Sequence, residues 1–470
     1  MKMASFHSTK LLSFLLILLH SGAAFSAIVK TLPGYSGELP FTLETGYISV
    51  GNIEFFYYFV ESESNPGADP LLLHLNGGPG CSGLNGFFYQ IGPLKFNITN
   101  YTGGLPQLLY EPNTWSKTAN LIFLDFPVGA GFSYATTTDA WSTTDVESAE
   151  HAHYFLRNWL TEHPDFQTNP VYISTDSYAG IHGPIIAQYI LEGNTAGLDP
   201  VVNLKGLSLS CPHTDTVIEA NAKIPFAHRL ALISDEIYES AVESCNGIYT
   251  NIDPANTACV EAIAAIDECT QLISIQNVLD PNCAFLSPQA QELKAGRYLR
   301  GNNKNNILLS PRTRSDHDLY CHNFAYLLSP IWGNYKSVQE ALNVREGTVS
   351  EFFRCNISLS YTVDVDSVIP YHQNLTNKGL QLLVFSGDHD MVMPHNGIEK
   401  WIGSLDLTVD TDWRPWFSDS GQVAGYTVKY TNSGYRLTYA TLKGSGHSPA
   451  EYNREDCYTM FHRWIHYYPI

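Results

Sequence analysis

Positive charge is scarce in this chain. Its 470 residues include 26 Lys and Arg against 46 Asp and Glu, for a formal net charge of −20 and a pI near 5.2. Nucleic acids and anionic membrane surfaces bind clustered cations, so this balance argues against both as partners. The length supports a large core, and α/β folds of this size often form a single domain.

Long apolar runs are scarce as well. Leu11–Leu19 follows M-K-M and precedes the small residues S-G-A-A-F-S-A, which is the pattern of a secretory signal peptide. We expect this peptide to span residues 1–26 and the mature chain to span 27–470. The run is too short to cross about 30 Å of bilayer, and no later stretch is long and apolar enough. The mature protein is therefore expected in the lumen of the secretory pathway or outside the cell, with no membrane contact.

The C-x-x-C spacing is absent from the nine cysteines, which argues against a cysteine zinc site. The secretory route favours disulfides, and the odd count leaves at least one cysteine without a partner in the chain. Four sequons fit the same compartment, although the first two lie too close together for efficient modification of both. The candidate glycosylation sites are Asn97, Asn100, Asn356 and Asn374.

Short apolar runs alternate with helical patterns along most of the chain, after a hairpin expected around Val50–Asn52. Such runs are typical of buried central strands. Strands that alternate with helices indicate an α/β fold with a mostly parallel central sheet and helices on both faces. The predicted strands are Leu71–Leu75, Leu121–Leu124, Val171–Ile173, Gln381–Phe385 and Leu437–Leu442, and the predicted helices are Asp145–Leu160, Ala179–Leu191 and Arg454–Tyr467.

Residues from about 213 to 330 interrupt this alternation. They hold five of the nine cysteines and little strand pattern, so we predict a helical cap inserted over the site. Within them, Gln291–Asp318 is polar, rich in Asn and carries six of the 26 Lys and Arg. That composition predicts an exposed loop open to proteases, and cleavage there would leave two chains joined by disulfides.

The stretch S-T-D-S-Y-A-G at residues 174–180 suggests a nucleophilic serine. A strand, a tight turn and a helix would present Ser177 at the top of the sheet, as in the G-x-S-x-G elbow of α/β hydrolases. Ala179 fits the close approach that this turn needs, whereas Thr175 stands where a glycine is usual. As a lone motif this signal is weak, because serine between small residues is common.

The order of possible partners strengthens the assignment. An α/β-hydrolase triad runs Ser, then Asp, then His along the chain. Asp390 follows a predicted strand in S-G-D-H-D, and His447 follows the last one in G-S-G-H. Both lie at carboxyl ends of strands, where α/β sheets place their sites. Asp388 competes with Asp390, and a plain turn with an exposed histidine is the alternative for His447.

A glycine-rich loop, N-G-G-P-G at residues 76–80, supplies backbone N–H groups. A phosphate loop is the rival interpretation, but no G-K-[ST] follows. Beside a nucleophilic serine, an oxyanion hole is the better assignment, with the N–H groups of Gly78 and Tyr178 as donors. The later G-A-G lacks the third glycine of a dinucleotide turn, so we interpret it as a plain loop.

Taken together, five motifs resemble the serine carboxypeptidase-like proteins. They are L-N-G-G-P-G-C-S-G, D-F-P-V-G-A-G-F-S-Y, D-S-Y-A-G, S-G-D-H-D-M and G-S-G-H-S-P-A-E, in order along nearly all of the mature chain. W-R-P-W-F followed by G-Q-V-A-G-Y is similar to the plant acyltransferase subgroup of that family. The resemblance implies an α/β-hydrolase fold, a triad of Ser177, Asp390 and His447, and a vacuolar or extracellular location. It also implies the disulfides Cys81–Cys355, Cys245–Cys259 and Cys283–Cys321, with Cys269 as an alternative to Cys283.

The resemblance further separates peptidase from acyltransferase. Family peptidases hold a substrate carboxylate through an asparagine and two glutamates that share a proton. Asn76 matches the asparagine and lies beside Gly77, but Asp176 and Gln90 replace the glutamates. The sequence therefore predicts a single carboxyl at this place. Asp before the serine resembles the acyltransferases, whereas Thr175 departs from the glycine usual in both subgroups and motivates a catalytically silent alternative.

The resemblance to the acyltransferase subgroup implies transfer of an acyl group from a 1-O-β-glucose ester to an acceptor hydroxyl in plant specialised metabolism. The partners are then a small-molecule donor and acceptor, no cofactor or metal is implied, and the protein is a monomer or a heterodimer of processed chains. A serine carboxypeptidase and a catalytically silent lumenal protein are the alternatives. Cleavage of a blocked dipeptide would identify the first, and failure of a fluorophosphonate to label Ser177 would identify the second.

Overall fold

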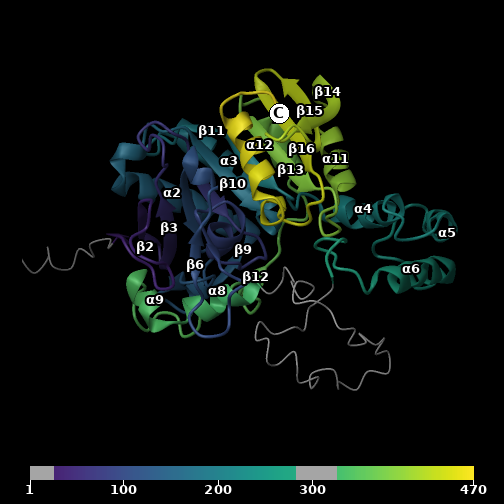
Figure 1. Ribbon diagram of the computed structural model, residues 1–470. Coiled ribbons are helices and arrows are strands. Elements are labelled where there is room, and N and C mark those ends of the chain that lie inside the picture. The colour runs from purple at the N-terminus through teal and green to yellow at the C-terminus, as the bar shows by residue number, and fades with distance from the viewer. Residues whose placement is uncertain (1–25, 282–324) are drawn as a thin grey trace, which may run out of the picture.

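The computed structural model describes residues 26–281 and 325–470 (Figure 1). Almost all of the predicted signal peptide, the predicted loop Gln291–Asp318 and the pair Cys283–Cys321 lie outside these ranges. Within the described ranges, no helix is both long and apolar enough to cross a bilayer.

A large mixed sheet forms the centre of the molecule. Its strand order is β1-β2-β3-β7-β4-β10-β11-β13-β16-β15-β14, and β8 pairs with β3. The six strands from β7 to β16 are parallel, and antiparallel strands extend both edges. The strands are β1 (Ala27–Ile28), β2 (Leu43–Val50), β3 (Ile53–Val60), β4 (Leu71–Leu75), β7 (Asn120–Leu124), β8 (Tyr134–Ala135), β10 (Val171–Asp176), β11 (Leu204–Ser210), β13 (Gln381–Gly387), β14 (Thr408–Phe417), β15 (Val423–Asn432) and β16 (Tyr435–Leu442).

Two short ribbons accompany the main sheet, and helices cover both of its faces. The ribbons pair β5 (Leu94–Phe96) with β6 (Leu108–Tyr110), and β9 (Ser142–Thr144) with β12 (Ser360–Thr362). The helices are α2 (Asp145–Glu162), α3 (His182–Thr195), α4 (Thr216–Arg229), α5 (Asp235–Cys245), α6 (Thr257–Thr270), α8 (Ala325–Gly333), α9 (Lys336–Ala341), α10 (Ile369–Leu375), α11 (His395–Gly403) and α12 (Arg454–Ile465). Short helical turns are η1 (Gly86–Gln90), η2 (Trp115–Lys117), η3 (Asp139–Trp141), η4 (Pro164–Phe166), η5 (Ser177–Gly180) and η8 (Pro449–Glu451).

The sheet separates two apolar clusters because successive strand residues face opposite sides. Phe55 of β3 belongs to the cluster that contains side chains of α2, α3, α10 and α11, whereas its neighbour Phe56 belongs to the cluster that contains side chains of α8, α9 and α12. The central strands β4, β7 and β10 are buried at every position, which explains their nearly continuous apolar sequences. The α/β-hydrolase architecture predicted from the sequence is confirmed.

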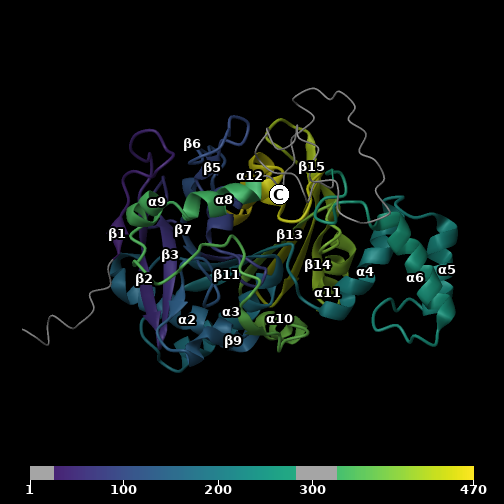
Figure 2. The ribbon, with the colours of Figure 1, turned by 90° about the horizontal axis from the view of Figure 1, so that it is seen from below.

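The chain between β11 and β13 carries the helices α4, α5 and α6. Helix α4 packs on α11, while α5 and α6 pair and project from the body of the molecule in both views (Figures 1 and 2). After α6 the chain returns to the sheet, where the Gln276 carbonyl accepts a hydrogen bond from His447 N at 2.6 Å. Helix α8, the first one described after residue 324, belongs to the second apolar cluster. The insertion limits near 213 and 330 and the role of a cap stay predictions.

Candidate active site

Ser177 lies in a tight turn directly after β10. Its φ of 59° is in the left-handed region, which non-glycine residues rarely adopt outside constrained turns. The turn passes close to the end of β11, because a Cβ on Gly180 would lie 2.6 Å from Pro212 Cβ and 2.7 Å from the His213 carbonyl oxygen. Helix α3 starts at His182, so the predicted helix from Ala179 begins with the short turn η5. The geometry is that of a nucleophile elbow.

Thr175 is accommodated inside the sheet. It pairs in register with Leu75 of β4 and Leu209 of β11, and its side chain is fully buried. Its Cγ2 methyl lies 3.2 Å from the place where a Cβ on Gly183 would stand. The glycine that permits close packing of strand and helix is therefore supplied by α3. The Thr175 hydroxyl finds no hydrogen-bond partner within the described part of the chain.

The three predicted triad residues meet at the carboxyl ends of β10, β13 and β16. His447 Nε2 lies 2.7 Å from Ser177 Oγ, and His447 Nδ1 lies 2.8 Å from Asp390 Oδ2. The other carboxylate oxygen of Asp390 accepts backbone N–H groups from Val392 and Met393 at 2.7 and 3.1 Å. These contacts hold the imidazole in the orientation that a general base needs. The competitor Asp388 instead contacts His389 Nδ1 at 2.6 Å.

The charge on His447 is stabilised by its surroundings. Burial disfavours the imidazolium, but Asp390, followed by Asp176 and Glu451, outweighs burial and raises the pKa of His447 to about 9. The Asp390 side chain is fully buried, so its field on the imidazole is weakly screened by solvent. The pair suits the transition state, in which His447 has taken the Ser177 proton.

The glycine-rich loop packs against the nucleophile turn. A Cβ on Gly77 would lie 2.5 Å from Tyr178 N and 2.8 Å from the Asp176 carbonyl oxygen. Gly78 has a φ of 118°, which an L side chain rarely adopts. Only glycines let the two backbone segments come this close. The loop thus brings the proposed donor Gly78 next to the turn that carries the second donor, Tyr178.

Gln90 joins the other predicted binding residues into one buried network. Burial lowers the pKa of His74 to about 4, so its imidazole is neutral. Gln90 Oε1 accepts from Asn76 Nδ2 at 3.0 Å and lies 3.1 Å from His74 Nε2, a contact that needs the tautomer with its proton on Nε2 because an amide oxygen only accepts. The Gln90 amide nitrogen, Nε2, donates to Asp176 Oδ2 at 3.0 Å. Ser448 Oγ donates to the same Asp176 oxygen at 2.7 Å.

Glu451 is a member of this network that the sequence analysis missed. Its Oε1 lies 3.2 Å from Gln90 Nε2, and its other oxygen accepts a hydrogen bond from Tyr326. The prediction of a single carboxyl at this place is therefore wrong, because Asp176 and Glu451 both contact the Gln90 amide nitrogen. Burial, with Glu451 adding to it, raises the pKa of Asp176. Glu451 stands four residues after His447 in a quoted motif, which was the available signal.

Cys211 is a second residue that the sequence did not single out. Cys211, Asp390 and His447 place ligand atoms within 4.8 Å of one another, a spacing compatible with a metal ion. Both ring nitrogens of His447 already contact Ser177 and Asp390, however, which favours the triad as the interpretation. The Cys211 thiol is buried next to Asp390 and Asp176, and burial first, then these acids, raises its pKa well above the usual range.

Two of the three predicted disulfides fall in the described ranges and are present. Cys81 is bonded to Cys355, and Cys245 is bonded to Cys259. Among the described residues, Cys211, Cys269 and Cys457 form no disulfide. Of the sequon asparagines, Asn100 and Asn374 are exposed and Asn97 and Asn356 are half-buried, and their glycosylation stays a prediction.

Comparison with known proteins identifies the family. The family model described as serine carboxypeptidase, Peptidase S10, matches residues 33–467. Serine carboxypeptidase-like 7 of Arabidopsis thaliana is 41% identical, and the match covers 98% of both chains. Serine carboxypeptidase-like 19 of the same plant is 40% identical over 97% of both. The fold is similar to that of Kex1Δp, a prohormone-processing carboxypeptidase from Saccharomyces cerevisiae, with a TM-score of 0.69, 18% identity, and coverage of 94% of this chain and 95% of that one.

Proposed function

This chain belongs to the serine carboxypeptidase family, and from that premise we propose that it is an acyltransferase rather than a peptidase. The donor is a 1-O-β-glucose ester, the acceptor is a hydroxyl compound of plant specialised metabolism, and Ser177 carries the acyl group between them. The relatives' names say only carboxypeptidase-like, so the proposal rests on the residues around Ser177.

The observation that carries the proposal is the amide of Gln90 between two acids. A peptidase site of this family needs a carboxyl pair that shares a proton and accepts the substrate carboxylate. Here the Gln90 amide donates toward Asp176 and Glu451, at 3.0 and 3.2 Å, and cannot titrate. One donor of Asn76 is also engaged, on Gln90 Oε1. A free carboxylate would meet acids instead of a proton, whereas a neutral sugar ester brings no such charge.

The chemistry proceeds through an acyl-enzyme. Ser177 Oγ attacks the acyl carbon while its proton moves to His447 Nε2, and the oxyanion accepts the N–H groups of Gly78 and Tyr178. The bond to the glucose oxygen breaks, and His447 returns the proton to that oxygen. The acceptor hydroxyl then gives its proton to His447 and attacks the acyl carbon, and the bond to Ser177 Oγ breaks while His447 returns that proton to Ser177. Asp390 holds the imidazole throughout.

The setting that fits this reaction is the secretory route, with the vacuole or the extracellular space as destination. The N-terminal signal pattern and the four sequons support that placement. We propose a small-molecule donor and acceptor as the partners, and a monomer or a heterodimer of processed chains as the assembly.

The decisive experiment offers the purified glycoprotein a panel of acyl-glucoses and acceptors and follows products by mass spectrometry, with blocked dipeptides assayed in parallel. We expect acyl-glucose consumption and transfer, and little or no dipeptide cleavage. Ser177→Ala is expected to abolish transfer, and His447→Ala to lose about as much, because triad residues act as a unit.

The variant Gln90→Glu, combined with Asp176→Glu, is the matched test of specificity. It replaces the amide by a titratable group next to Glu451, so some dipeptide cleavage is expected to appear in acid, where the carboxyls share protons. Efficient dipeptide cleavage by the unmodified protein, without transfer to any acceptor, would return it to the peptidases. Failure of a fluorophosphonate to label Ser177 would instead identify a silent family member.

A further inference from the structure

A strap formed by residues 354–365 lies along the glycine-rich loop. The Arg354 carbonyl accepts from Ser82 N at 2.9 Å, and Asn356 N donates to the Gly80 carbonyl at 2.9 Å. Between these two hydrogen bonds, Cys355 is bonded to Cys81. Leu359 then covers the loop, since a Cβ on Gly80 would lie 2.6 Å from Leu359 Cδ1. The first half of the strap therefore fixes the segment that follows the proposed donor Gly78.

The second half of the strap closes on Asp145 at the start of α2. Tyr361 OH donates to Asp145 Oδ1 at 2.6 Å, and the backbone N–H groups of Asp364 and Val365 donate to Oδ2 at 2.8 and 3.1 Å. The Asp364 carboxylate in turn accepts from Asp145 N at 2.9 Å. Asp145 is fully buried, so these contacts are shielded from water.

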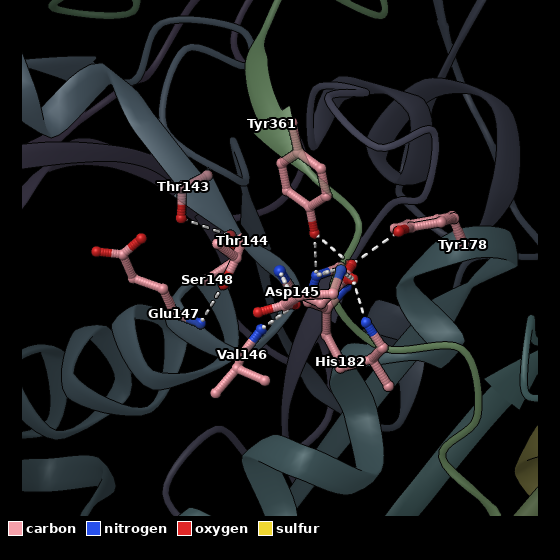
Figure 3. A network of polar contacts seen from close by, with 11 residues as sticks. Thr143, Thr144, Asp145, Val146, Glu147, Ser148, Tyr178, His182 and Tyr361 are labelled. Carbon is pink, nitrogen blue, oxygen red and sulfur yellow. Dashed lines mark hydrogen bonds and ion pairs between the residues drawn. The ribbon is translucent and has the colours of Figure 1, made fainter.

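Asp145 also holds the residue that follows the nucleophile. Tyr178 OH donates to Asp145 Oδ1 at 2.7 Å, and Figure 3 shows the rings of Tyr178 and Tyr361 reaching the same carboxylate from different segments of the chain. His182 Nε2 lies 3.0 Å from Tyr361 OH. Burial opposes ionisation of Asp145, but hydrogen bonds from Tyr361, Tyr178 and the Asp364 backbone outweigh it and hold the pKa of Asp145 below its usual value.

We propose that the strap sets the width of the oxyanion hole, with Tyr361, Asp145 and Tyr178 as positioning residues. One end of the strap is tied covalently to the glycine-rich loop that carries Gly78. The other end reaches Tyr178, the second donor, through one buried carboxylate. One segment of twelve residues, 354–365, thereby positions both donors of the oxyanion hole. The inference rests on the proposed acylation of Ser177, but on no particular acyl donor.

The physical reason lies in how sharply such donors depend on position. Hydrogen bonds to an oxyanion act only when the donors already lie about 2.7–3.1 Å from the place where the charge develops. The Tyr178 hydroxyl donates to Asp145, so it acts on the oxyanion only by fixing the position of Tyr178. Loss of that bond leaves the Tyr178 ring free to turn and its N–H free to move by a fraction of an ångström. Such a shift weakens binding of the transition state more than it weakens binding of the substrate.

The test measures the acylation burst with a p-nitrophenyl ester in Tyr361→Phe, Tyr178→Phe and Asp145→Asn. Each substitution keeps the ring or the size of the side chain, so thermal melts should confirm folding. Tyr154→Phe, on the exposed surface of α2, is the matched control. We expect the acylation rate constant to fall about tenfold in the three variants, below the 10²–10³ seen when a donor itself is removed. The substrate dissociation constant, taken from the concentration dependence of the burst rate, should stay unchanged. Affinity for a trifluoromethyl ketone, which forms the oxyanion, should fall by the same factor.

The double variant Tyr178→Phe with Tyr361→Phe should lose less than the product of the single losses, because both hydroxyls act through Asp145. Folded variants that acylate at the unmodified rate would overturn the proposal, as would weaker substrate binding with the acylation rate constant unchanged. A normal ester burst in a protein that ignores every acyl-glucose would contradict the proposed function alone and leave this test intact.

Discussion

At the residue scale, the choice of an amide at position 90 controls the charge around His447. Gln90 Oε1 receives two donors and its Nε2 faces two acids, so a glutamate there would add a third carboxyl to Asp176 and Glu451. Three carboxyls in one buried network cannot all ionise without a large cost. The amide limits this network to two carboxyls near His447 and contacts both of them.

The acids that raise the pKa of His447 also predict the pH dependence of acylation. His447 must be neutral to accept the Ser177 proton, so the rate should rise with pH along a limb whose apparent pKa lies above the ordinary value of 6.5. Glu451→Gln removes one of the acids that raise the pKa of His447, so the limb should move to lower pH and acylation should speed up in acid relative to the unmodified protein. Stopped-flow ester bursts from pH 5 to 10 measure this shift, because that range covers both the ordinary histidine pKa of 6.5 and the raised pKa of about 9.

Glu455→Gln serves as the matched control, because it removes the same charge from an exposed position on α12. Its pH limb should coincide with that of the unmodified protein. A limb that stays in place in Glu451→Gln would show that Glu451 does not act on His447.

At the element scale, the candidate site is built from two turns whose backbones lie in close contact. The loop after β4 and the turn after β10 approach so closely that no side chain fits at Gly77. Parallel neighbours place both turns at the same edge of the sheet, since β4 and β10 pair directly.

Gly77→Ala tests this contact. The added methyl would meet Tyr178 N at 2.5 Å and the Asp176 carbonyl at 2.8 Å, both backbone atoms that cannot rotate away. We expect kcat/KM for ester acylation to fall by about 10² or more, as when an oxyanion donor is lost, and stability to fall by roughly 1–3 kcal/mol. Gly67→Ala, just before β4, meets no atom within 4 Å and should leave both unchanged or slightly improved. Equal kinetics in the two variants would contradict the close contact.

Much of this element arrangement was predictable from local patterns. The apolar runs of β4, β7, β10, β13 and β16 and the periodicity of α2 and α12 locate most of the core correctly. β11, L-K-G-L-S-L-S, was not predicted, because Lys, Gly and Ser dilute its apolar run. The edge hairpin of β14 and β15 was also missed, because its outer face is exposed and carries mixed residues.

The site was predictable only as far as motif order reaches. Ser177, Asp390 and His447 follow the expected order and lie together, although 270 positions separate Ser177 from His447. The contact of Gln90 with Glu451 spans 361 positions and leaves no periodic signal in the sequence. The tie from Tyr361 to Tyr178 through Asp145 is equally remote, because it depends on the strap crossing the start of α2.

At the scale of the whole molecule, the two halves of the chain build the site jointly. The first half supplies the glycine-rich loop and the nucleophile turn, and the last part supplies Asp390 after β13 and His447 after β16. The Cys81–Cys355 bridge joins these parts across a sequence separation of 274, directly beside the glycine-rich loop. The Cys245–Cys259 bridge spans only 14 positions and lies in the projecting α5–α6 pair (Figure 1).

This difference gives a prediction for the paired serine variants. In the chain-entropy model, Cys81→Ser with Cys355→Ser should cost roughly 5 kcal/mol of unfolding free energy and Cys245→Ser with Cys259→Ser roughly 3 kcal/mol. Equilibrium urea titrations measure both. The ester burst separates stability from function, because loss of the long bridge also frees the strap from the glycine-rich loop and should slow acylation, whereas loss of the short bridge should not. A short-bridge variant that slows acylation as much as the long-bridge variant, at temperatures where both are folded, would show that the bridges act on the site through general stability. Slow acylation confined to the long-bridge variant would instead show that the glycine-rich loop is held in place by its covalent tie to Cys355.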